Sequence, residues 1–119
     1  MRKLLALLAV SEALTGLLLL VYPPVVIHLL FDQEIAGAGV FMSRLAGIIL
    51  IALGIACWPD SNTPVRALYG MLTYSILAMS YLAYVGASGG RGILLWPAVA
   101  VHAGLCVLLI RARLKVAQQ

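Results

Sequence analysis

The segment LLALLAVSEALTGLLLLVY, from Leu4 to Tyr22, is an almost unbroken apolar run in a chain of 119 residues. Its length is close to the roughly 20 residues that a helix needs to cross a bilayer. Ser11 and Glu12 interrupt the run at its middle. The segment therefore predicts a membrane-spanning helix with a carboxyl group in the hydrocarbon region, where a charge is costly unless it has a partner or a task.

The composition of the whole chain supports a membrane location. Hydrophobic residues make up 64% of the chain and charged residues 10%, so it lacks the polar surface of a soluble domain. The positions of the basic residues between the apolar segments are more informative than the net charge of +4, and we expect no nucleic-acid partner. We expect residues 1–119 to form a single integral membrane domain whose partner is the lipid bilayer.

Four apolar segments are long enough to span a membrane, and turn-forming residues separate them. Pro23 and Pro24 end the first segment, WPDSNTP (58–64) follows the second, and GASGGRG (86–92) follows the third. We predict an all-α, four-helix transmembrane bundle with up-down-up-down topology. The expected spans are residues 4–22, 36–58, 65–85 and 93–110.

The segment VVIHLLF, from Val25 to Phe31, is too short to span a membrane. It predicts a short interfacial helix, with a turn into the second span at residues 32–34. A continuation of the first span after a proline kink is the alternative. At the N-terminus, MRKLLALLAVSEA resembles a signal peptide, but the apolar run resumes at Leu14 and continues to Val21. We expect a retained first span.

The distribution of basic residues predicts the orientation. Four spans place both termini and the turn at 58–64 on one side, and the other side holds Arg91 with Asp32 and Glu34. The positive-inside rule then places both termini in the cytoplasm of a bacterial-type inner membrane. The basic residues on the side of the termini are Arg2, Lys3, Arg66, Arg111, Arg113 and Lys115.

One polar or ionisable side chain per span falls at a similar depth when depth is estimated from the helical rise of about 1.5 Å per residue. These are Glu12, Arg44, Tyr74 and His102, and each shares a helical face with small residues that favour close helix packing. We predict that they form a polar layer inside the bundle, with an ion pair between Glu12 and Arg44. Weaker polar groups around the layer are Ser11, Thr15, Ser43, Thr73 and Ser75.

The polar layer has two interpretations, which the sequence leaves open. In the structural one, Glu12 and Arg44 lock the register of the helices, and Tyr74 and the hydroxyl groups satisfy the remaining donors and acceptors. In the functional one, the layer binds a small polar head group or relays protons, with Glu12 or His102 changing protonation.

Tyrosines are frequent in the third span. Tyr69, Thr73, Ser80 and Tyr84 share one helical face, and Tyr81 lies on a neighbouring face. They could line a cavity for a flat or amphipathic molecule, but contacts between helices are the favoured role.

No cofactor is predicted. A haem with two histidine ligands needs His28 and His102 at matching depth, and His28 lies near the outer edge. Carboxylates and histidines show no metal-ligand spacing on one helix. Cys57 and Cys106 are too far apart for a CxxC motif and are expected to be small buried apolar residues, with a redox pair as the alternative.

Two known families share features with the chain. Its size, its four spans and Glu12 in the first span resemble the small multidrug resistance transporters, dual-topology dimers that exchange protons for cationic drugs. Departures from that family are the strong charge asymmetry, the presence of Arg44, and a third span without the glycine-rich dimerisation pattern.

The stretches SEALTGLLLLVYP (11–23) and SRLAGIILIALGIACW (43–58) are similar to the DoxX-like group of small bacterial four-helix membrane proteins. The shared features are an acidic residue in the first span and Arg-x-x-Gly in the second. This resemblance implies a four-helix bundle with a membrane-associated redox or lipid-related role.

The leading hypothesis is a small inner-membrane protein whose buried Glu12, Arg44, Tyr74 and His102 bind a small or amphipathic molecule, with movement of that molecule or of a proton as an extension. A non-catalytic accessory subunit of a larger membrane complex is the alternative. A proton-coupled exporter comes third, and a membrane enzyme fourth. A homodimer is favoured if the protein transports anything.

Overall fold

The computed structural model describes residues 2–60 and 64–118, which form five α-helices and no strand. Four of the helices are long and apolar enough to cross a membrane, so the predicted all-α bundle of four spans is confirmed and the chain is a small integral membrane protein. The helices are α1 (Arg2–Val21), α2 (Pro23–Phe31), α3 (Ala38–Ala56), α4 (Pro64–Ala87) and α5 (Leu95–Ala117).

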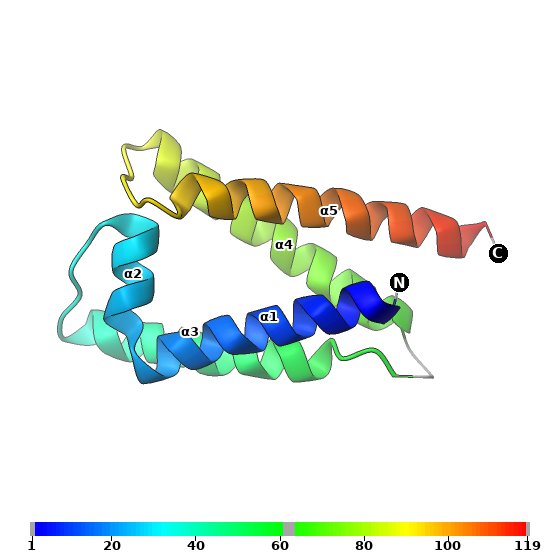
Figure 1. Ribbon diagram of the computed structural model, residues 1–119, viewed down its shortest axis with the longest axis horizontal. Coiled ribbons are helices and arrows are strands. Elements are labelled where there is room, and N and C mark those ends of the chain that lie inside the picture. The colour runs from blue at the N-terminus through cyan, green and yellow to red at the C-terminus, as the bar shows by residue number, and fades with distance from the viewer. Residues whose placement is uncertain (1, 61–63, 119) are drawn as a thin grey trace.

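Successive long helices run in opposite directions, as the up-down-up-down prediction requires (Figure 1). The two termini and the start of the α3–α4 connection lie at one end of the molecule, called here the terminal end. The α2 helix and the α4–α5 turn lie at the other end, called here the α2 end. Residues 61–63 of the predicted turn at 58–64 lie outside the described residues.

The helix boundaries differ most from prediction in α5, which continues to Ala117 although its apolar run ends at Ile110. Residues 111–117 are RARLKVA, and arginine, alanine, leucine and lysine all have high helix propensity. The length of an apolar run predicts how much helix can lie in hydrocarbon. It does not predict where the hydrogen-bonded helix ends.

The α2 helix is separate from α1 rather than a kinked continuation of it. Tyr22 leaves the helical conformation at φ −140° and ψ 69°, and the two prolines that follow occupy the first positions of α2. Those positions suit proline because their backbone amides have no partner inside the helix. Asp32 ends α2 in the left-handed conformation, at φ 52°, with its backbone N–H bonded to the carbonyl of His28. The predicted short helix is thus confirmed, and α2 runs from the end of α1 toward the α4–α5 turn (Figure 1).

The α1 and α3 helices pack closely because glycines face each other at their contact. A Cβ atom added to Gly16 would lie 2.5 Å from the carbonyl oxygen of Gly47, and one added to Gly47 would lie 2.5 Å from that of Gly16. A Cβ atom on Gly54 would lie 2.6 Å from the carbonyl oxygen of Ala9. Small residues of this kind allow backbones in a bilayer to approach closely.

The α4 and α5 helices form the second close pair. Gly86 of α4 leaves room for the indole of Trp96, which a Cβ atom there would approach to 2.7 Å. Near the terminal end, the Nε of Arg113 donates a 2.8 Å hydrogen bond to the hydroxyl of Tyr69.

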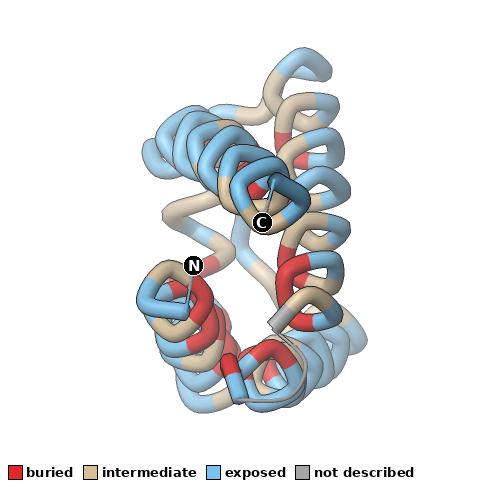
Figure 2. The backbone as a smooth tube through the Cα atoms, turned by 90° about the vertical axis from the view of Figure 1, so that its right-hand side faces the viewer, coloured by how far each residue is buried: buried red, intermediate tan, exposed pale blue. Residues whose placement is uncertain are grey.

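The two helix pairs meet at both ends of the molecule. At the α2 end, the N–H of Leu94 donates a 2.8 Å hydrogen bond to the carbonyl of Leu29. At the terminal end, a hydrophobic core draws on α1, α4, α5 and the end of α3, and Figure 2 shows buried residues where these helices face one another. Its buried members are Leu5, Leu8, Cys57, Ala67, Leu68, Met71 and Leu109.

The outer surfaces of the helices carry exposed apolar side chains, such as Leu7, Phe41, Ile55 and Val107. In water, such a surface would drive aggregation. In a bilayer, lipid tails cover it, which agrees with the four spans.

Candidate functional site

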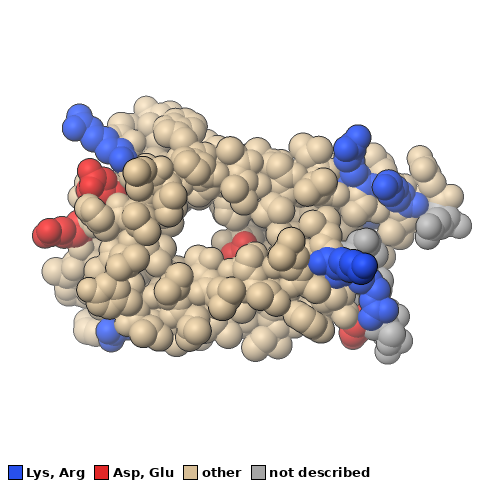
Figure 3. Space-filling view, in the orientation of Figure 1, with Lys and Arg blue, Asp and Glu red and all other residues tan. Residues whose placement is uncertain are grey.

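A central opening separates the α1–α3 pair from the α4–α5 pair, and acidic side-chain atoms lie at its edge (Figure 3). Among the four acidic residues of the chain, Asp32, Glu34 and Asp60 lie in connections at the two ends. The carboxyl group at the opening therefore belongs to Glu12, in the middle of α1. Glu12 is buried, with 6% of its surface exposed.

Glu12 is tied to the other helix pair through Tyr74. The hydroxyl of Tyr74, on α4, donates a hydrogen bond to the Glu12 carboxyl group. The Tyr74 ring in turn meets the ring of His102, on α5, edge to face, with centroids 5.8 Å apart and an interplanar angle of 79°. Three of the four predicted members of the polar layer thus form a chain, Glu12–Tyr74–His102, through α1, α4 and α5.

Two atoms in or beside the Glu12–Tyr74–His102 series are buried without a hydrogen-bond partner in the described part of the protein. They are the Nδ1 of His102 and the Oγ of Ser75, the residue that follows Tyr74. Buried polar atoms in proteins almost always have a partner, so each such atom needs an explanation. An unpaired histidine nitrogen beside a carboxyl–tyrosine pair is the kind of group that a ligand or an ordered water satisfies.

The predicted ion pair between Glu12 and Arg44 does not hold in this structure. Arg44 is exposed, and no ion pair to it occurs within residues 2–60 and 64–118. The glycine contacts explain the separation. Since Gly47 lies between Gly16 and Leu20, and Gly54 lies against Ala9, Arg44 is level with the end of α1. The two charges are therefore roughly nine residues apart along the helix axis, or about 13 Å.

The smaller predicted polar residues do not join the chain of three. Ser11 and Thr15 are exposed, and their hydroxyls donate 2.9 Å hydrogen bonds to carbonyl oxygens of their own helix, those of Leu8 and Ser11. Thr73 is exposed on α4, and Ser43 is half-buried on α3. The hydroxyls of Ser11 and Thr15 are therefore satisfied within α1. We assign none of these four residues to the Glu12–Tyr74–His102 series.

The tyrosines of α4 divide by role. Tyr69 and Tyr74 make contacts between helices, as the favoured interpretation predicted. Tyr81 is 63% exposed and borders a shallow pocket at the α2 end together with Phe31 and Tyr84. Ser75 was predicted only as one of the weaker polar groups around the polar layer. In the structure it is fully buried, one helical turn after buried Met71 and on the same side of α4.

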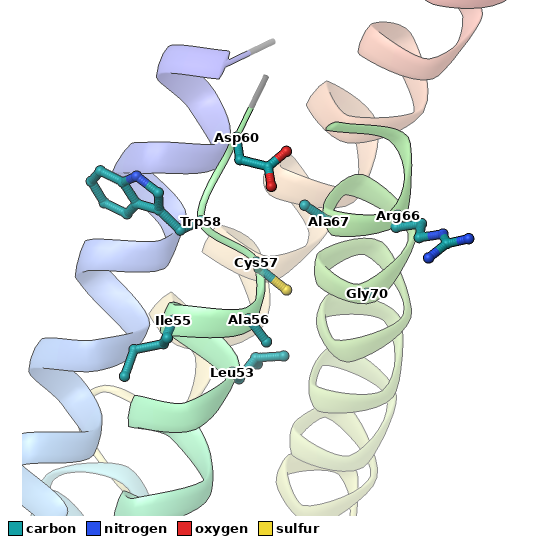
Figure 4. Close-up of a pocket in the computed structure, with 9 residues that line it drawn as sticks. All are labelled: Leu53, Ile55, Ala56, Cys57, Trp58, Asp60, Arg66, Ala67 and Gly70. Atoms are coloured by element: carbon teal, nitrogen blue, oxygen red, sulfur yellow. The ribbon is translucent and has the colours of Figure 1, made fainter. Parts of the chain in front are cut away.

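A second hollow lies between α3 and α4 at the terminal end, with a volume of about 540 Å³. The side chains of Cys57 and Asp60 point into it, whereas that of Arg66 points away (Figure 4). Burial raises the pKa of the Cys57 thiol, so the group is protonated at neutral pH and is a weak nucleophile. The Cys57 thiol is therefore not activated for catalysis.

Comparison of the chain with protein-family models, with curated proteins and with solved structures gave no match. The class that the fold and site define is a small four-span membrane protein with a carboxyl–tyrosine–histidine chain beside a central opening. The resemblances to DoxX-like proteins and to the small multidrug resistance transporters stay predictions from their motifs. Within the described residues, no group of three or more histidine, cysteine or acidic side chains could hold a metal ion.

Proposed function

We propose that this protein binds an amphipathic molecule in the opening between its two helix pairs, with the polar head of the molecule at Glu12, Tyr74 and His102. One observation carries the proposal. The carboxyl group of Glu12, midway along an apolar helix, has a neutral hydroxyl as its partner and no cation beside it in the described chain.

A purely structural role would leave this arrangement unexplained. An intramembrane carboxyl group costs a few kcal/mol even on the more lenient scales, and a lock between helices offsets that cost by pairing opposite charges. Arg44, the cation that could have supplied such a lock, is exposed elsewhere on α3. A carboxylate has about four acceptor positions, and Tyr74 uses one of them. The remaining positions are available to a ligand.

The site chemistry selects the kind of head group. Glu12 accepts hydrogen bonds, and the Nδ1 of His102 has no partner in the described residues. A head group with hydroxyl or amine donors can satisfy both, and the apolar remainder of the molecule can lie along the apolar helices. A lipid-related ligand is also what the resemblance of the first two spans to DoxX-like proteins implies.

The connections between the helix pairs favour binding over conduction. The core around Leu68 and Met71 joins the pairs at the terminal end, and the Leu94–Leu29 hydrogen bond joins them at the α2 end. The opening is therefore reached from the side, through the bilayer. A proton relay through the chain of three also finds little support, because Tyr74 and His102 meet through their ring edges rather than through a hydrogen bond.

We further propose that the terminal end faces the cytoplasm of a bacterial-type inner membrane. Six basic residues lie at that end, against Arg91 at the other end and Arg44 level with the end of α1, and this asymmetry supports the orientation. Labelling of single cysteines introduced at residue 2 and at residue 90 with a membrane-impermeant maleimide tests it. Labelling of residue 2 in intact cells would contradict the orientation.

Binding of a fluorescent lipophilic amine, 1-aminoanthracene, to the purified protein tests the proposed site. Glu12→Gln should weaken binding by about tenfold or more, because a hydrogen bond to a charged group contributes about 1.5–3 kcal/mol. The fold should persist, since the glutamine carbonyl can still accept from Tyr74. Glu34→Gln, which removes the same charge from an exposed connection, is the matched control and should bind as the wild type does.

Equal binding by the wild type and Glu12→Gln would refute the proposal. Purification in a mild detergent that brings a stoichiometric partner protein, together with unchanged probe binding in Glu12→Gln, would favour an accessory subunit instead.

A further inference from the structure

We propose that Arg113, held by Tyr69 and accompanied by Arg66, forms a site for the phosphate of an anionic phospholipid headgroup at the terminal end. The site is separate from the central opening and does not depend on the function proposed for that opening.

Two contacts with Tyr69 fix the guanidinium of Arg113. Its Nε donates a 2.8 Å hydrogen bond to the tyrosine hydroxyl, and its central carbon lies 5.5 Å from the centroid of the tyrosine ring. These contacts use one of the five N–H donors of the guanidinium. The terminal nitrogens keep the fork that matches two oxygens of a phosphate, and the immobilised side chain has less entropy to lose on binding.

The guanidinium of Arg113 has no carboxylate partner among the described residues, 2–60 and 64–118. Arg66 lies one helical turn before Tyr69, which places it on the same side of α4 and adds a second cation. The terminal end as a whole is basic (Figure 3). Its basic residues are Arg2, Lys3, Arg66, Arg111, Arg113 and Lys115, and its one acidic residue is Asp60.

The position along the helices selects a lipid phosphate. The apolar run of α5 ends at Ile110, so Arg113 lies about one turn beyond the hydrocarbon region. Tyr69 is 48% exposed, and tyrosine is enriched at this level of a membrane, beside the headgroups. A phosphate that reaches Arg113 can therefore carry acyl chains that lie against α4 and α5. Basic residues at this level recognise anionic lipids.

Native mass spectrometry of the full-length protein in detergent, with phosphatidylglycerol or phosphatidylcholine added at equal concentration, tests the site. The wild type should retain phosphatidylglycerol in preference to phosphatidylcholine. Arg113→Gln should reduce phosphatidylglycerol affinity about fivefold, the equivalent of about 1 kcal/mol per basic residue near the membrane surface. Arg91→Gln removes the same charge at the α2 end and should leave the affinity unchanged.

Tyr69→Phe keeps the aromatic ring but removes the hydroxyl that orients Arg113. It should reduce phosphatidylglycerol affinity by less than Arg113→Gln does, which separates a fixed site from a loss of net charge. Equal affinities for Arg113→Gln and Arg91→Gln would overturn the proposal. Displacement of bound phosphatidylglycerol by inorganic phosphate at an equal concentration would also overturn it, because the site would then select a free anion.

Discussion

Replacement of Gly47 with alanine should force α1 and α3 apart. The added methyl group would lie 2.5 Å from the carbonyl oxygen of Gly16 and 2.8 Å from the backbone nitrogen of Leu20. Both are backbone atoms, which cannot rotate away as the end of a side chain can. The helices must therefore separate by about 1 Å to restore an ordinary van der Waals contact.

The free-energy cost follows from this separation. Inserting a methyl group into a close-packed contact costs about 1–3 kcal/mol. Alanine also has a higher helix propensity than glycine, by about 1 kcal/mol, which offsets part of the cost. Gly104→Ala isolates the propensity term, because a Cβ atom at Gly104 of α5 would meet nothing within 4 Å. Gly47→Ala should thus be about 1–3 kcal/mol less stable than Gly104→Ala.

Reversible unfolding in mixed micelles with increasing dodecyl sulfate, followed by circular dichroism, measures this difference. The free energy of unfolding of the wild type should lie between those of the two variants or close to that of Gly47→Ala. If the free energies of unfolding of the two variants agree within about 0.5 kcal/mol, the scatter expected of a surface substitution, the close contact of α1 with α3 is refuted.

Three further predictions test other parts of the structure. Gly92→Ala would place a methyl group against the backbone carbonyl of Leu30, so it should separate α2 from the α4–α5 turn. Hydrogen exchange of the Leu94 amide, which bonds to α2, should then become faster. An unchanged exchange rate would contradict the contact between α2 and this turn. Tyr74→Phe removes the donor to Glu12 and should lower the free energy of unfolding by about 1–3 kcal/mol, whereas the exposed Tyr81→Phe should stay within about 0.5 kcal/mol of the wild type. Burial raises the pKa of the Cys57 thiol, so N-ethylmaleimide should label Cys57 of a Cys106→Ser variant more slowly in the native than in the denatured protein. The native labelling rate should also rise with pH over a higher range than that of an exposed thiol. Equal rates in the native and denatured protein would refute the burial of this thiol.

Glu12, Tyr74 and His102 show how much of the site the sequence could predict. Their similar depth follows from the rise per residue, a property of each helix alone, and the structure links them through a hydrogen bond and a ring contact. Arg44 was predicted at the same depth, but it lies level with the end of α1. The depth of Arg44 depends on the axial register of α3 against α1. The fit of Gly47 between Gly16 and Leu20 sets that register.

The sequence by itself determined the number and order of the spans, their alternation in direction and the separate α2 helix. These are local properties, since the length of an apolar run is matched to the thickness of a bilayer and two prolines end a helix wherever they occur. The tertiary structure alone decided that the bundle divides into two close pairs with an opening between them. It also decided that the partner of Glu12 is Tyr74 rather than Arg44. Both depend on the rotation and register of helices distant in sequence, which glycine contacts and ring packing fix only when the helices meet.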